Sequence, residues 1–284
     1  MSGAAVKRLG FVGAGRMGRP MVRRLVEAGY QVGVRARTEE AGESLAGLGA
    51  QAAGTLAEVG TGAEAVLICV HTDEQVREVC LDGGLLDAMA GGSALVIHTT
   101  GSPRTIDAIA ERAAPRGIQV IDAPVSGGPH DIAAGQLTLF VGGSEEAVSR
   151  IRPVLASYGD PVLHVGASGA GQRVKLLNNA LFAAHIGLLS DAVSLGRQLG
   201  VDEAVLLDAL PHASAASRAL TGATARGSVA GFAAAVSGFL RKDLLVVRTV
   251  AAELGGDLGA LDDAFNALAR TLVRADADSP HGSN

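Results

Sequence analysis

The chain has 284 residues, more than the roughly 150 of a typical domain, and this length predicts two domains. Hydrophobic residues make up 48% and charged residues 19%, a balance that supports sizeable cores and excludes a disordered or fibrous chain. The net charge of −5 and the lack of a basic block argue against a nucleic-acid partner.

Cysteine usage and the N-terminus indicate a cytoplasmic protein. The two cysteines, Cys69 and Cys80, cannot form a disulfide framework, and neither belongs to a C-x-x-C motif. The apolar run 9–12 is too short for a signal peptide. No apolar stretch reaches the 18 residues of a spanning helix without glycines and charges interrupting it, so no membrane partner is expected.

In the first part of the chain, from residue 7 to about 163, short β-branched apolar runs alternate with helical patterns. Strands are expected at 8–12, 31–35, 65–70, 94–99, 119–122, 137–141 and 161–165. Helical patterns include 16–28, 103–114 and 145–157. This alternation is typical of βαβ units in a parallel, doubly wound sheet.

After residue 171 the pattern becomes helical. Residues 172–199 contain no proline and predict one long helix, about 42 Å at 1.5 Å per residue. Gly200 suits the end of this helix, and Asp202 suits the N-cap of the next. Helices are expected to continue to about residue 274, and the polar segment 276–284 is expected to fray.

The first motif with chemical meaning follows the first strand and opens a helix. It consists of Gly13, Ala14, Gly15, Arg16, Met17 and Gly18. In a dinucleotide site the first glycine permits the tight turn, the second admits the pyrophosphate to the helix N-terminus, and the third lets helix and strand pack closely. The alternative is a glycine-rich turn without a ligand.

The end of the second predicted strand bears on the choice of dinucleotide. NAD sites usually place a carboxylate there, to bind the ribose 2′-hydroxyl. This chain has Arg35, Arg37 and Thr38 and no carboxylate before Glu39, which favours NADP, although NAD stays possible. The alternative is that both arginines are solvated surface charges.

A second motif begins at Asp122, just beyond a predicted strand. Open α/β sheets bind ligands at the carboxyl ends of their strands. The Ser126 hydroxyl and the N–H groups of Gly127 and Gly128 would make a nest for a carboxylate. The alternative is an ordinary turn rich in proline and glycine.

The third motif lies near the start of the long helix. Lys175 and Asn179 are one turn apart on one face, and Asn178 is adjacent. Of the 24 lysines and arginines only Lys7, Lys175 and Lys242 are lysine. A partly buried lysine can lose its proton near neutral pH, whereas arginine cannot. Lys175 is therefore a candidate general acid/base, the alternative being an exposed helical turn.

Taken in order, these motifs resemble the β-hydroxyacid dehydrogenase family, which includes 3-hydroxyisobutyrate dehydrogenase and related semialdehyde reductases. The family's G-x-G-x-M-G-x-x-M is met by residues 13–21, its D-A-P-V-S-G-G by 122–128, its G-x-G-x-x-x-K-x-x-N-N by 169–179, and its K-D-L by 242–244. The resemblance covers residues 9 to about 272.

The resemblance implies a fold and an assembly. The fold is an NADP-binding Rossmann-type domain at 1–165, followed by an all-α substrate and dimerisation domain at 166–284 that opens with the interdomain helix. A homodimer or homotetramer through the helical domain is implied.

The resemblance also assigns roles to single residues. Lys175 is the acid/base, and Ser126, Gly127, Gly128 and Asn179 hold a small carboxylate substrate, with Ser126 and Asn179 also counted as catalytic. Thr100 and Lys242 contact the cofactor near its nicotinamide, and Val70 is assigned to the cofactor site.

Several positions depart from the family pattern. After the Ser-Gly-Gly turn the usual Gly-Ala is Asp131-Ile132, and the usual threonine is Gln136. The family's D-M-S-T is residues 97–100 here, with His98 within it, and its G-x-S segment is replaced at 213–217. These departures leave the substrate open.

Two alternative functions stay open, an imine reductase and a non-catalytic NADP-binding scaffold. Lys175 argues against an imine reductase, because imine reductases usually lack that lysine. Lys175 and the two asparagines together argue against a non-catalytic scaffold. No metal site is expected, because the two cysteines and seven histidines form no ligand cluster.

Overall fold

The computed structural model of the protein describes residues 6–278, and side chains as far as residue 273. By its contacts the chain divides into two units, residues 1–175 and 176–284, and the division falls inside one long helix. The domain boundary expected after residue 165 lies at the end of the last strand, before this helix begins, and it stays a prediction.

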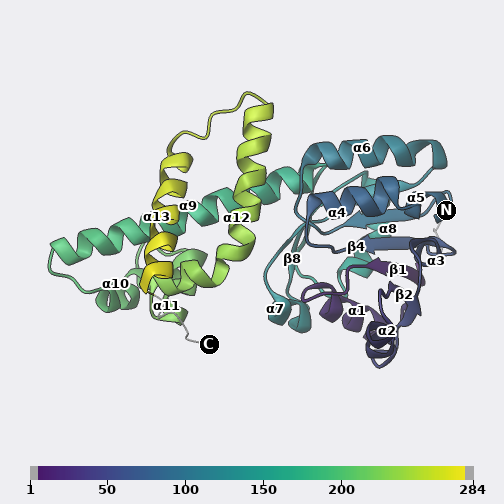
Figure 1. The fold of residues 1–284 in the computed structure, drawn as a ribbon, viewed down its shortest axis with the longest axis horizontal. Coiled ribbons are helices and arrows are strands. Elements are labelled where there is room, and N and C mark those ends of the chain that lie inside the picture. Colours follow the sequence, from purple (N-terminus) through teal and green to yellow (C-terminus); the bar gives the residue numbers. More distant parts are fainter. Residues whose placement is uncertain (1–5, 279–284) are drawn as a thin grey trace. The chain divides into compact units, whose positions relative to one another are not determined.

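A nine-stranded sheet forms the centre of the first unit (Figure 1). Its strand order is β3-β2-β1-β4-β5-β6-β8-β7, and β9 pairs with β8. The strands are β1 (Arg8–Val12), β2 (Gln31–Arg35), β3 (Gln51–Ala53), β4 (Ala65–Ile68), β5 (Ala94–Ile97), β6 (Gln119–Asp122), β7 (Val125–Ser126), β8 (Thr138–Gly142) and β9 (Val162–Gly166). Strands β1 to β6 run parallel, whereas β8 is antiparallel to β6 and β7.

Helices cover both faces of this sheet. They are α1 (Gly18–Glu27), α2 (Glu39–Ala46), α3 (Leu56–Gly60), α4 (Asp73–Arg77), α5 (Leu85–Ala88), α6 (Pro103–Ala113), α7 (Pro129–Ala134) and α8 (Glu145–Leu155), with a π-helical turn at Glu78–Asp82 and a 3-10 turn at Ala114–Arg116. One core packs α1, α7 and α8 against the sheet, and a second packs α3 to α6 against its other face. Strands β4 and β5 are therefore buried along their whole length, as central strands covered on both faces should be.

The expected Rossmann-type architecture is confirmed. All seven predicted strands are present, three of them with the predicted bounds. The short strands β3 and β7 are additional, because two or three residues give no readable periodicity. The antiparallel direction of β8 also differs from the parallel pattern, since hydrophobic patterning does not encode strand direction.

The second unit is entirely helical where the structure describes it (Figure 1). It contains most of α9 (Ala170–Gln198), then α10 (Glu203–Ala209), a 3-10 turn (Leu210–His212), α11 (Arg218–Arg226), α12 (Val229–Glu253) and α13 (Ala260–Asp278). The long helix predicted at 172–199 is thus confirmed. Gly200 has a φ of 77° and Asp202 is the N-cap of α10, as expected. Of the segment expected to fray, 276–278 continue α13 and 279–284 lie outside the described residues.

Helix α9 contains a longer apolar stretch than the sequence analysis expects. By length and composition it could span a membrane, and 44% of its most apolar 18-residue stretch is buried inside the protein. The buried side contributes Leu176, Ala180 and Ile186 to the core of the second unit. A core helix of a soluble protein meets the same test of length and composition.

Candidate active site

The turn between β1 and α1 requires glycine at two positions. Gly13 has a φ of 99°, and a Cβ there would lie 2.3 Å from the carbonyl oxygen of Cys69, just beyond β4. A Cβ at Gly18, the first residue of α1, would lie 2.1 Å from the Gly13 carbonyl oxygen and 2.8 Å from the Phe11 ring. The tight turn and the close helix–strand contact therefore both depend on a missing side chain.

The space in front of this turn is open. Apart from its chain neighbours, no atom of the described residues lies within 4 Å of where a Cβ at Gly15 would be. The N-cap residue Met17 makes no side-chain capping bond, and the first turn of α1 carries no acidic residue. The N–H groups at a helix N-terminus attract anions. Residues 13–18 thus fit a dinucleotide pyrophosphate.

An open cavity of about 600 Å³ lies beyond the carboxyl end of β2, lined in part by Arg35, Arg37 and Thr38. The Arg35 guanidinium donates a hydrogen bond to the Ala36 carbonyl oxygen, and the Thr38 hydroxyl caps α2 by accepting the N–H of residue 41 at 3.2 Å. Arg37 is exposed. Glu39 and Glu43 line the same cavity, which therefore carries both signs of charge.

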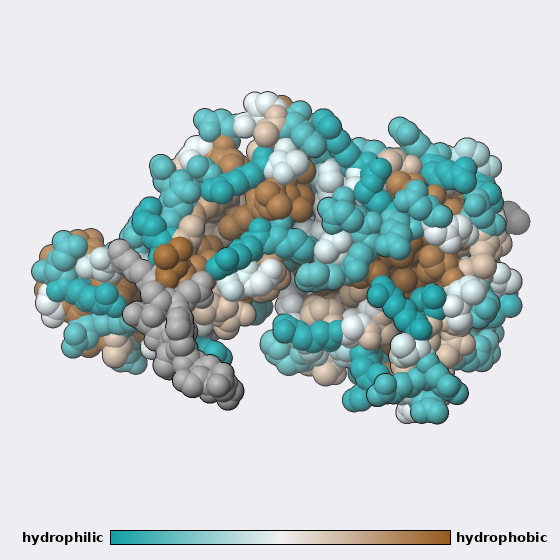
Figure 2. Space-filling model, in the orientation of Figure 1, coloured by the Kyte–Doolittle hydropathy of each residue, from teal (hydrophilic) through white to brown (hydrophobic). Residues whose placement is uncertain are grey.

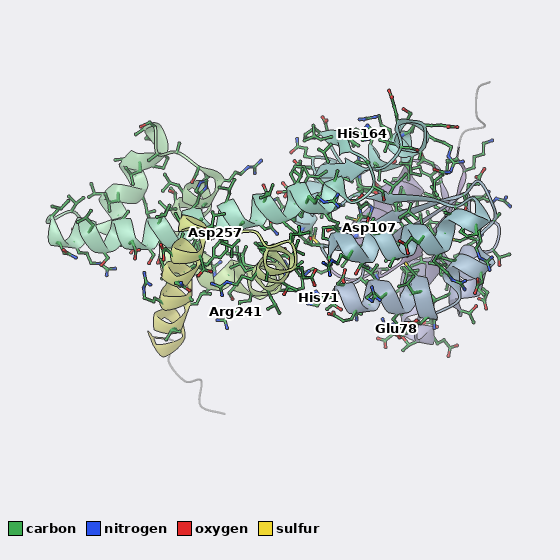
Figure 3. The ribbon with its side chains drawn as sticks, turned by 90° about the horizontal axis from the view of Figure 1, so that it is seen from above. His71, Glu78, Asp107, His164, Arg241 and Asp257 are labelled. Carbon is green, nitrogen blue, oxygen red and sulfur yellow. The ribbon has the colours of Figure 1, made fainter. Side chains whose placement is uncertain are left out.

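The loops after β4 and β5 are tied together. The Thr99 hydroxyl donates to the Val70 carbonyl oxygen at 2.8 Å, and the Asp73 carboxylate accepts the Ser102 N–H at 3.0 Å and the Thr105 hydroxyl at 2.6 Å. Figure 3 shows the neighbouring residue His71 at the N-terminal end of α4. Val70 and Thr100 are half-buried in these loops. The fixing role of Asp73 has no local signal in the sequence.

Asp122 is fully buried and connects the end of β6 to the start of α9. Its Oδ1 accepts the Gly169 N–H at 2.6 Å, and its Oδ2 accepts the Gln172 N–H at 2.7 Å. Burial raises the pKa of Asp122, while these two N–H groups and the positive charge of Arg173 act in the opposite direction. The aspartate of the Asp-Ala-Pro motif therefore caps the long helix from a distant strand.

The Ser126–Gly128 turn differs from the expected nest in one respect. The Gly128 N–H already donates to the Asp131 carboxylate at 2.6 Å, and the His130 imidazole lies 3.3 Å from the same oxygen. A Cβ at Gly127 would lie 2.7 Å from that oxygen. Ser126 and Gly127 are half-buried or exposed at the surface of this turn. A departure from the family pattern, Asp131, thus occupies one of the donors predicted to bind a carboxylate.

Lys175 lies in the second turn of α9 and is only 7% exposed. This burial excludes the exposed-turn interpretation of the motif. Asn179 follows one helical turn later and is 1% exposed.

Within the second unit, Asn179 belongs to a buried polar cluster. Its amide Nδ2 donates to the Asp243 carboxylate, and its Oδ1 accepts from the Asn178 amide at 2.9 Å. The Lys242 ammonium lies 2.9 Å from Asp243 Oδ1, as an ion pair without the geometry of a hydrogen bond. Asp243 therefore orients Asn179, a role the sequence analysis missed although it noted the Lys-Asp-Leu motif.

Other candidate groups have structural partners. His98 and Tyr158 form a buried hydrogen-bonded pair. Burial raises the pKa of the Cys69 and Cys80 thiols to about 12, so neither thiol is activated. Among the side chains up to residue 273, no group of three or more histidine, cysteine or acidic residues is arranged to hold a metal ion.

Comparison with known proteins matches both parts of the chain. Residues 8–166 match the NAD binding domain of 6-phosphogluconate dehydrogenase, and residues 169–281 match the NAD-binding region of NADP-dependent 3-hydroxyisobutyrate dehydrogenase. A 3-hydroxyisobutyrate dehydrogenase of Pseudomonas aeruginosa is 38% identical over 213 residues, 75% of this chain and 72% of the relative.

The chain belongs to the β-hydroxyacid dehydrogenase family.

As a family member, the protein is an NAD(P)-binding oxidoreductase that acts on the CH–OH group of small hydroxy acids. Its structure resembles that of the Mycobacterium tuberculosis 3-hydroxyisobutyrate dehydrogenase with L-serine, with a TM-score of 0.83, 28% identity and 94% of each chain covered. An imine reductase from Pseudomonas sp. has a TM-score of 0.60 at 20% identity, covering 97% of this chain and 89% of its own, which is a likeness of fold alone.

Proposed function

We propose that this β-hydroxyacid dehydrogenase interconverts a small β-hydroxy acid and its semialdehyde or keto acid, with NADP as cofactor and Lys175 as general acid/base. The main support for this proposal is that Lys175 is only 7% exposed and lies one turn before Asn179, in a chain whose other basic residues are mostly arginine. A buried amine can change its protonation near neutral pH, as an acid/base must.

In the oxidation direction the neutral Lys175 amine accepts the proton of the substrate hydroxyl. In reduction its ammonium returns that proton to the carbonyl oxygen. The bound nicotinamide supplies or accepts the hydride. Asn179 orients the reacting oxygen, and its amide is already fixed by Asp243 and Asn178, so little ordering is needed when substrate binds. Ser126 and Gly127 contact the carboxylate of the substrate.

The dinucleotide would be held by residues that come from five parts of the chain. Residues 13–18 would hold the pyrophosphate, and the cavity beyond β2 would hold the adenosine ribose. Arg37 and Arg35 support a 2′-phosphate there, which favours NADP over NAD. Val70, Thr100 and Lys242 are assigned to the nicotinamide side.

We also propose a cytoplasmic homodimer or homotetramer, formed through the helical unit. Four leucines of α9 are more than half exposed, and Figure 2 shows apolar surface on the helical unit. Exposed apolar stripes of this kind mark protein interfaces.

The first experiment follows NADPH consumption with methylmalonate semialdehyde, tartronate semialdehyde, succinic semialdehyde and glyoxylate, with NADH as the comparison cofactor. Lys175→Ala should lose roughly 10²–10⁴ of turnover on the active substrate, the usual value of a general acid/base. Lys175→Arg is the matched variant, because it keeps the positive charge but cannot give up a proton.

NADPH binding, followed by its fluorescence, and the melting temperature should stay close to those of the parent in both variants. Full turnover in either variant would overturn the assignment of Lys175. NADPH binding without turnover on any carbonyl acid would favour the scaffold alternative, and turnover on a cyclic imine instead would favour the imine reductase.

A further inference from the structure

Gln172 lies in the first turn of α9, and its side chain is completely buried. Its amide Nε2 donates to the Thr99 carbonyl oxygen at 2.8 Å, and its Oε1 accepts the Gly101 N–H at 3.0 Å. The two ends of one amide thus form hydrogen bonds with the backbone on both sides of Thr100, the residue assigned to the nicotinamide side of the cofactor. Both of its polar atoms are satisfied, as a buried amide requires.

The backbone of Gln172 is also held by a hydrogen bond. Its backbone N–H donates to Asp122 at 2.7 Å, and the other oxygen of that carboxylate accepts the Gly169 N–H at 2.6 Å. The loop after β5, the end of β6 and the first turn of α9 therefore meet at Gln172.

The backbone around Gln172 and Asp122 is closely packed. A Cβ at Gly171 would lie 2.4 Å from the Phe140 carbonyl oxygen, and one at Gly142 would lie 2.4 Å from Asp122 Oδ1. Backbone atoms packed this closely transmit a displacement rather than absorb it. Lys175 follows Gln172 by three residues, so the two residues are neighbours on the surface of the helix.

We propose that Gln172 is a positioning residue, which sets the Lys175 amine at a fixed place relative to the loop that carries Thr100. This inference rests on the proposed function of Lys175. Proton and hydride must be exchanged with one substrate carbon–oxygen bond, so the two groups need a fixed separation, and a misplacement of about 1 Å can cost about a hundredfold in rate.

The test is Gln172→Met, which keeps the length and volume of the side chain but removes both hydrogen bonds. We expect kcat to fall about tenfold or more while the KM values for NADPH and substrate change much less. The deuterium isotope effect with 4-deuterated NADPH should rise, because the chemical step becomes more rate-limiting.

Two comparisons separate positioning from loss of fold. Thr271→Val removes a partly buried hydrogen bond of 2.6 Å to Ser190 in the second unit, and it should leave kcat and the isotope effect unchanged. Gln172→Glu keeps the acceptor for Gly101 but loses the donor to Thr99, and its kcat should lie between those of the parent and Gln172→Met. All rates are expressed per NADPH-binding site, so unfolded protein does not count.

A normal kcat per binding site in Gln172→Met would overturn the proposal. An unchanged isotope effect, with activity lost only in step with binding sites, would overturn it as well. Failure of the proposed function has a different signature, since Lys175→Ala would then keep its turnover whatever Gln172→Met does.

Discussion

His98, a departure from the family pattern, has a structural explanation at the level of single side chains. Its Nδ1–H donates to the Ala123 carbonyl oxygen at 2.7 Å, and its Nε2 accepts the Tyr158 hydroxyl at 2.8 Å. Both rings are buried and meet edge to face, with centroids 5.7 Å apart. The bonds require a neutral imidazole, and through them His98 supports the Asp-Ala-Pro loop.

This pair predicts a pH dependence of stability. Burial lowers the pKa of His98 from 6.5 to about 4, so the folded protein keeps it neutral while the unfolded chain protonates it. The stabilisation is complete above pH 6.5 and is lost as the pH falls toward 4, by about 2 kcal/mol between pH 8 and pH 5. Urea unfolding of the parent and of His98→Gln should show a smaller loss in the variant; equal losses would contradict the assignment.

Asp131 lies at the Ser126–Gly128 turn, which we propose binds the substrate carboxylate. Its carboxylate accepts the Gly128 N–H and places a negative charge at this turn. Asp131→Gly should free that donor and lower the KM for carboxylate substrates by about tenfold, the scale of one nearby charge at a protein surface. Asp131→Asn removes the charge but keeps an acceptor for Gly128.

The steady-state KM across the carbonyl-acid panel checks this prediction. A large fall in both variants attributes the effect to charge, and a fall in Asp131→Gly alone attributes it to the freed N–H. No change in either variant would mean that the substrate carboxylate binds away from this turn.

At the level of elements, α9 depends on contacts that its own sequence does not provide. Its first turn is capped by Asp122 from β6, and at Gly187 it touches α13. A Cβ at Gly187 would lie 2.1 Å from the Ala264 carbonyl oxygen, a backbone atom that cannot rotate away. Glycine in mid-helix is therefore required by the packing of two helices.

Two glycine-to-alanine changes should consequently act in opposite directions. Gly187→Ala should destabilise the protein by about 1–3 kcal/mol through overpacking. Gly238 lies in the interior of α12, and beyond its own stretch of helix no atom of the described residues lies within 4 Å of the new Cβ. Gly238→Ala should therefore stabilise the protein by up to about 1 kcal/mol through helix propensity. Thermal and urea unfolding of both variants measure the contrast, and stabilisation by Gly187→Ala would refute the close contact.

At the scale of the whole molecule, the leucine stripe of α9 gives a test of assembly. The stripe consists of Leu177, Leu181, Leu188 and Leu195, each between 53% and 62% exposed. At 100° per residue these positions fall within an arc of about 40° on one side of the helix. A continuous leucine face on a monomer would be unusual, and a second copy of the chain would cover it.

The double change Leu188→Glu with Leu195→Glu should convert the oligomer into a monomer of 28.5 kDa. Leu245→Glu, on α12 and 66% exposed, is the control for an added charge elsewhere and should leave the mass unchanged. Light scattering after gel filtration gives the mass directly. A parent that is already monomeric, or a double variant that stays oligomeric, would rule out this face as the interface.

The sequence by itself determined the Rossmann-type unit, the long helix and the motifs at residues 13–18, 122–128 and 175–179. These features depend on short-range periodicity and on residue types that local chemistry demands, such as a glycine at a φ of 99°. The scarcity of lysine in this chain also counts against an exposed Lys175, although it does not by itself fix the burial of the residue.

Only the tertiary structure decided which partners hold these residues. Asp122 reaches Gly169 across 47 positions, Gln172 reaches Gly101 across 71, and Asn179 reaches Asp243 across 64. No local pattern specifies such pairs, because each is a hydrogen bond whose donor and acceptor meet only when separate strands and helices pack. The occupation of the Gly128 N–H spans just three residues, yet it too escaped prediction, since it depends on how the turn at Gly127 directs the chain into α7.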